Sequence, residues 1–127
     1  ATAELINIWI LLCLGHAPFS KDRKGLTLTF KPLLKKELFT KKAKTVSFLG
    51  RKITIPANTF SFVMFSKTLV CYHNHKRKDT YSKGCSVEKI IFTLNNKKVI
   101  YYSDTIKAPH AQIIRKAGVQ RIDVFLT

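Results

Sequence analysis

The residues best suited to chemistry lie between two cysteines in the middle of the chain. Cys71 and Cys85 enclose 13 residues that are rich in cations and rings. The cations are Lys76, Arg77, Lys78 and Lys83, and the neighbouring rings are His73, His75 and Tyr81. Such cations bind phosphate or sulfate groups, and a ring can stack on a base. The segment therefore predicts a polyanion-binding loop, with a solvated basic turn as the alternative.

A second basic pair extends this predicted site. Lys97 and Lys98 follow Asn95-Asn96, which predicts a hairpin turn because Asn tolerates positive φ. In the strand that follows, one of Tyr101 and Tyr102 must face outward, where it could stack on a base or sugar. Lys97 and Lys98 are therefore included among the predicted polyanion-binding residues.

The two cysteines allow two interpretations. If the strands that carry them pair, Cys71 and Cys85 can form a disulfide that contributes about 3 kcal/mol by closing the loop. A disulfide requires an oxidising compartment and would indicate a secreted domain. Two buried free thiols are the alternative, and an intracellular or virion location is then favoured.

Metal binding and catalysis receive weaker support. Cys71, His73 and His75 alternate on one face of a strand, and Cys85 would complete a Cys2His2 set, but the spacing matches no usual zinc pattern. We predict no metal and no cofactor. His16, His73, His75 and His110 could serve in a small ribonuclease, yet no spacing singles out a pair. We therefore predict no catalytic residues and no enzyme.

Composition supports a binding role. The chain has 127 residues, with 23 Lys and Arg against 7 Asp and Glu, which gives a net charge of +16. This excess indicates a negatively charged partner. Lys acts as a point charge, whereas base readout favours Arg, so the dominance of Lys favours sequence-tolerant contacts.

Most of the chain has the alternation that is typical of β-strands. Residues 59–70 predict one long central strand that is apolar on both faces, and residues 119–127 predict a closing strand. Leu26, Leu28 and Phe30 alternate in a further strand, and residues 20–24 predict a polar turn. A hairpin is predicted over residues 44–56, with its turn at Gly50-Arg51.

The remaining segments are helical or ambiguous. Residues 33–44 suit either a short helix or a basic connection, whereas residues 109–117, between Pro109 and Gly118, predict a short helix. The apolar run within residues 1–17 is too short to span a membrane. It could form part of the core, dock on a partner chain, or be the remnant of a signal peptide.

Together these patterns predict a single domain over residues 1–127. We expect a mainly β fold, with α+β as the alternative: one antiparallel sheet, sandwich or barrel of about six to eight strands. The expected function is a non-enzymatic module that binds RNA or DNA through its phosphates, within a viral or ribonucleoprotein assembly or a homo-oligomer. The alternatives are a secreted domain that binds a receptor or sulfated glycan, and a small ribonuclease.

Overall fold

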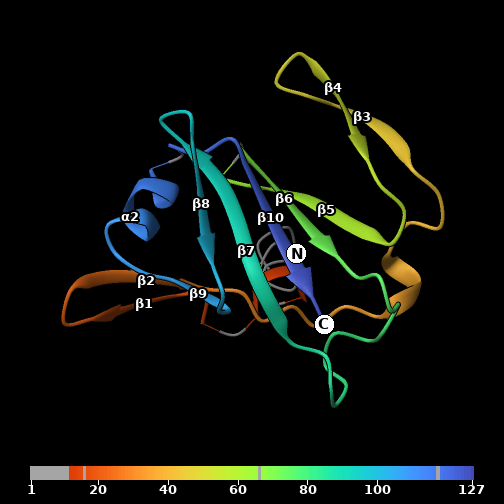
Figure 1. Ribbon diagram of the computed structural model, residues 1–127, viewed down its shortest axis with the longest axis horizontal. Helices are drawn as coiled ribbons and strands as arrows, with labels where there is room; N and C mark the ends of the chain where they lie inside the picture. The colour runs from red at the N-terminus through yellow and green to blue at the C-terminus, as the bar shows by residue number, and fades with distance from the viewer. Residues whose placement is uncertain (1–11, 16, 66, 117) are drawn as a thin grey trace, which may run out of the picture.

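The computed structural model describes residues 12–15, 17–65, 67–116 and 118–127, and its described part is mainly β with short helical segments (Figure 1). This confirms the predicted fold class. The strands are β1 (Phe19–Asp22), β2 (Gly25–Thr29), β3 (Lys44–Phe48), β4 (Arg51–Ile55), β5 (Thr59–Met64), β6 (Thr68–His73), β7 (Val87–Leu94), β8 (Lys97–Tyr101), β9 (Thr105–Ile106) and β10 (Arg121–Leu126). The helical segments with defined bounds are the 3₁₀ turn η1 (Lys36–Leu38) and the α-helix α2 (His110–Arg115).

The described strands form three sheets. The largest is five-stranded, in the order β5-β6-β10-β7-β8, and its pairs are antiparallel except for β6 with β10. The second is three-stranded, in the order β1-β2-β9, and β3 pairs with β4 in a separate hairpin. Side chains of β2, the five-stranded sheet and α2 share one apolar core, which makes the arrangement sandwich-like.

The predicted central strand over residues 59–70 is wrong, because the chain folds back within it. β5 and β6 form an antiparallel hairpin in which Met64 lies opposite Thr68, and Phe65 has a positive φ of 56°. An apolar run on both faces fits two adjoining strands as well as one long strand. β6 is buried along its whole length, whereas β5 is an edge strand.

The centre of the large sheet is the C-terminal strand. β10 lies between β6 and β7, so the predicted closing strand is the middle strand of the five. Ile122, Val124 and Leu126 point into the main core, as their alternation predicted. Arg121, Asp123 and Phe125 alternate with them and therefore lie on the opposite face of the sheet.

Local turn and helix signals were largely correct. Asn95 and Asn96 form the β7–β8 turn with φ of 52° and 62°, and α2 lies within the predicted helical segment. The β3–β4 turn is one residue earlier than predicted, at Leu49-Gly50, because Phe48 pairs with Arg51. Both turn residues have positive φ, as a type I′ turn requires.

Two other segments differ from expectation. Residues 20–24, predicted as a turn, overlap β1, and the turn itself is confined to Arg23-Lys24 between Asp22 and Gly25. Asp22 Oδ1 accepts hydrogen bonds from the backbone N–H groups of Lys24 and Gly25, which fixes this turn. In the ambiguous segment 33–44, only η1 is helical.

The described part of the N-terminal segment belongs to the core. Residues 12–14 are helical, and Cys13 and Leu14 are buried in the main core. The carbonyls of Leu12 and Leu14 accept hydrogen bonds from Leu33 and Lys31. The rest of the predicted apolar run, residues 1–11, and His16 lie outside the described residues.

Candidate functional site

The predicted basic loop is attached to the body of the protein and does not project from it. It joins β6 to β7, and these strands are separated in the sheet by β10. Thr80 Oγ1 donates to the Pro32 carbonyl and accepts from the Leu34 N–H, and Asp79 Oδ1 accepts from the Lys36 N–H. These bonds hold the loop against residues 32–36, so several polar side chains of the loop stabilise the fold.

Arg77 and Lys78 are the cations most involved in this attachment. Arg77 Nη1 donates to the Thr40 carbonyl at 3.0 Å and to Asn58 Oδ1 at 2.9 Å, and Nη2 donates to the Lys36 carbonyl at 3.3 Å. Lys78 Nζ donates to the Gly84 carbonyl at 3.0 Å. The Arg77 guanidinium therefore joins three parts of the chain and is a structural group.

Substitution of Arg77 should lower stability, whereas substitution of its neighbour should not. Arg77→Gln removes charge-assisted hydrogen bonds from partly buried acceptors, and we expect the free energy of unfolding to fall by about 2 kcal/mol. Lys76 is exposed, so Lys76→Gln removes the same charge and should change stability by less than about 0.5 kcal/mol. Urea denaturation of both variants measures the difference, and equal stabilities would contradict the structural role of Arg77.

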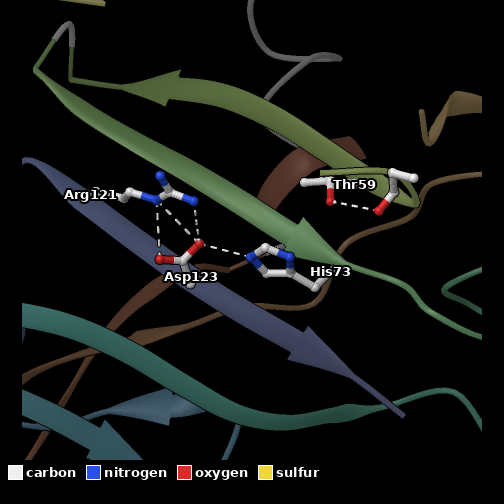
Figure 2. A network of polar contacts seen from close by, with 5 residues as sticks. Thr59, His73, Arg121 and Asp123 are labelled. Atoms are coloured by element: carbon white, nitrogen blue, oxygen red, sulfur yellow. Dashed lines mark hydrogen bonds and ion pairs between the residues drawn. The ribbon is translucent and has the colours of Figure 1, made fainter. Parts of the chain in front are cut away.

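His73 is also buried and bound within the protein. Its ring is 7% exposed and stacks on Phe125, with the ring centroids 4.5 Å apart. Figure 2 shows His73 and Arg121 reaching Asp123 from two directions. His73 Nε2 lies 2.7 Å from Asp123 Oδ1, and Arg121 binds both carboxylate oxygens, with Nη2–Oδ1 at 3.0 Å and Nε–Oδ2 at 3.1 Å. His73 is therefore engaged in contacts within the protein, and a polyanion-binding role for it stays a prediction.

This network holds Asp123 in its charged form. Burial alone would raise the pKa of Asp123, but the hydrogen bonds and charges of His73 and Arg121 outweigh burial and lower it. The carboxylate is therefore ionised at neutral pH, and the Arg121 guanidinium compensates its charge. The network fixes β6 to β10 on the face of the sheet opposite the main core.

The other predicted residues form two separate groups. His75, Lys76, Tyr81 and Lys83 are exposed in the loop that precedes β7, whereas Lys97 and Lys98 are exposed just after β7 ends. The two groups are about 25 Å apart, since β7 has eight residues that each advance about 3.3 Å. The structure therefore does not bring the predicted set together as one site. Tyr102, at 78% exposure, is the outward-facing tyrosine of the pair, and Tyr101 bonds to His110.

A groove on the open face of the large sheet is a candidate site. It has a volume of about 820 Å³ and lies over β7, β8 and β10. Its lining is polar and basic around an apolar floor. The lining residues are Ile91, Phe92, Thr93, Asn95, Asn96, Lys98, Gly118, Gln120, Arg121, Asp123 and Phe125. Asp123 is the one acid among these described residues, and the Arg121 guanidinium compensates its charge.

The groove can contact a ligand through its charged and amide side chains more than through its aromatic rings. Phe125 stacks on His73, and Lys89 Nζ lies 5.0 Å from the centroid of the same ring. Phe92 is 2% exposed and belongs to the core. Neither ring presents a free face to a base, whereas Lys98, Asn95 and Asn96 can donate hydrogen bonds to phosphate oxygens.

Sequence reasoning missed most residues of this groove. Arg121 and Gln120, which line the groove, and Lys89, which lies beside Phe125, are isolated in the sequence and are not part of any basic run. The available signal was the alternation of the last strand, which places Arg121 and Asp123 opposite Ile122 and Val124. Only the pairing of β10 with β7 adds Ile91 and Lys89 to the same face.

The described structure does not contain the disulfide that Cys71 and Cys85 could have formed. Both are free thiols, as is Cys13. Cys71 packs with Ile55 and Leu69, whereas Cys85 packs against the main core, and β10 separates β6, which carries Cys71, from β7, which begins after Cys85. Burial raises the pKa of the Cys71 thiol to about 11, so it is protonated at neutral pH.

The same separation argues against the zinc set. Cys71, His73, His75 and Cys85 do not converge, and no group of three or more potential metal ligands occurs within the described residues.

Two of the histidines considered for the ribonuclease alternative lie on opposite faces of the large sheet. His73 contacts Asp123 on the open face, whereas His110 contacts Phe92 and Tyr101 on the core face. They cannot act as an acid–base pair on one substrate.

Comparison with known proteins does not identify a family for this chain. No protein-family model matches the chain, and no curated protein matches it in sequence. None of the described helices is long and apolar enough to cross a membrane.

Proposed function

We propose that this chain is a non-enzymatic module that binds RNA or DNA through the phosphate backbone. The observation that carries the proposal is the groove on the open face of a sheet in a chain of net charge +16. A polyanion that binds there would relieve the mutual repulsion of the cations. The groove residues Lys98, Asn95 and Asn96 are the expected phosphate contacts, with Lys89 on the same face of the sheet.

The lining of the groove supports backbone contact over base readout. Sequence-specific recognition uses bidentate Arg or amide pairs that reach base edges. The Arg121 guanidinium already donates to both carboxylate oxygens of Asp123. Phe125 stacks on His73, and Phe92 is buried, so neither ring is free to stack on a base. The free lysines act as point charges, which bind phosphates without fixed geometry.

The proposal is tested by two charge-matched double variants. Lys89→Gln/Lys98→Gln removes two cations on the groove face, and Lys21→Gln/Lys24→Gln removes two exposed cations from the β1–β2 hairpin. We expect the groove variant to bind an RNA or DNA oligonucleotide about tenfold more weakly than the parent, and the control variant to bind within about threefold of it. Fluorescence anisotropy at fixed salt measures both. Equal losses in the two variants would contradict the groove as the interface.

A further inference from the structure

The β3–β4 hairpin is the most isolated part of the described structure. We use the term arm for residues 41–55, which comprise this hairpin and the lysines before it. β3 and β4 pair only with each other within the described sheets, and Figure 1 shows the hairpin extending away from the two larger sheets. A two-stranded hairpin is marginally stable by itself, so its base must be supported.

The arm is supported by apolar side chains on one of its faces. Ile55 is fully buried against Leu69 and Cys71 of β6, while Val46, Phe48 and Ile53 are partly buried there. Towards the tip, Leu49 is 53% exposed, and Gly50 and Arg51 are exposed. The arm is therefore held along one face, and its turn is exposed.

The arm is also uniformly basic. It carries five exposed cations: Lys41, Lys42, Lys44, Arg51 and Lys52. No Asp or Glu occurs between Glu37 and Asp79 in the sequence. The pairings Lys44–Ile55 and Ser47–Lys52 place cations on both faces of the ribbon. Among the described residues, none of these cations forms an ion pair.

The arm and the groove lie on the same face of the large sheet. Cys71, which supports the arm, is the register partner of Asp123, which lines the groove. Residues paired in register project from the same face. A bound polyanion can therefore contact the groove and the arm together.

We propose that the arm lies in the major groove of duplex DNA while the sheet groove contacts the adjacent phosphates. The major groove of B-form DNA is about 12 Å wide and admits a two-stranded β-ribbon, whose strands are about 4.8 Å apart. Cations on both faces of the ribbon suit a groove that is bordered by phosphates on both sides. The A-form major groove of RNA is too deep and narrow for this contact. The inference rests on the proposed nucleic-acid binding and specifies its substrate.

The test compares two variants that each lose one Arg and one Lys from a hairpin. Arg51→Gln/Lys52→Gln alters the arm, and Arg23→Gln/Lys24→Gln alters the exposed β1–β2 turn. We expect the arm variant to bind a 20-base-pair DNA duplex about tenfold more weakly than the control variant. On an RNA duplex and on single-stranded DNA of the same sequence, the two variants should bind alike. Coincident thermal unfolding curves establish that both variants are folded.

Competition provides a second measurement on the unmodified chain. Methyl green, which occupies the major groove, should displace the protein from the DNA duplex, and netropsin, which occupies the minor groove, should not. Equal binding of the arm and control variants to duplex DNA, or displacement by netropsin alone, would overturn the arm proposal while leaving nucleic-acid binding intact. Failure of the parent chain to bind any nucleic acid would instead overturn the proposed function.

Discussion

Raising the salt concentration from about 50 to about 200 mM should weaken binding of this chain to nucleic acid by about 10³–10⁵-fold, if roughly six to ten phosphates are engaged. Each phosphate neutralised by a lysine or arginine releases condensed counterions, and added salt reduces the gain from that release. The chain has 23 Lys and Arg, and the arm and the groove together provide enough cations for such a footprint.

A plot of the logarithm of the binding constant against the logarithm of salt concentration has a slope that gives the number of phosphates contacted by the protein. For duplex DNA, the slope should decrease in magnitude by about 1.8 for a double variant that loses two contacts, such as Arg51→Gln/Lys52→Gln. Arg23→Gln/Lys24→Gln should leave the slope of the parent nearly unchanged. A binding constant that hardly varies with salt would exclude backbone contact as the basis of recognition.

Ile122→Ala should be among the most destabilising single substitutions in the chain. We expect it to lower the free energy of unfolding by about 3 kcal/mol. Ile122 is fully buried in β10, with Val70 of β6 and Phe92 of β7 as its register partners on either side. Truncation there leaves a cavity in the middle of the large sheet, in addition to the lost burial of the side chain. Denaturant unfolding monitored by circular dichroism measures the loss.

Ile100→Ala provides the matched control. Ile100 lies on β8 at the edge of the same sheet and is 41% exposed. The same change there should cost less than about 1 kcal/mol, because little apolar surface leaves water on folding. A similar cost at both positions would contradict the central place of β10.

The two proposals assign different tasks to cations that look alike in sequence. Arg77 and Lys78, inside the most basic run, bond to backbone and amide oxygens of the protein itself. Lys98 and Arg51 lie outside that run, yet they are exposed at the groove and on the arm. A dense run of positive charge therefore does not by itself locate a polyanion site, because the fold can use some of those charges internally.

The sequence by itself determined the features that depend on neighbouring residues. Alternation in residues 26–30 and 122–126 correctly predicted which side chains face the core, and Asn95-Asn96 correctly predicted a turn. Pro109 and the residues after it predicted the helix that α2 provides. These features follow from backbone preferences and from the period of each element, which are local properties of the chain.

The tertiary structure alone decided which segments meet. The insertion of β10 between β6 and β7 separates Cys71 from Cys85 and joins His73 to Asp123, 50 residues further along the chain. It also forms the groove by placing Arg121 and Lys98 on one face. The order of strands in a sheet depends on the packing of the whole core and is not recorded in the pattern of any one strand. For this reason the charge predicted the kind of partner, while the fold decided where that partner is proposed to bind.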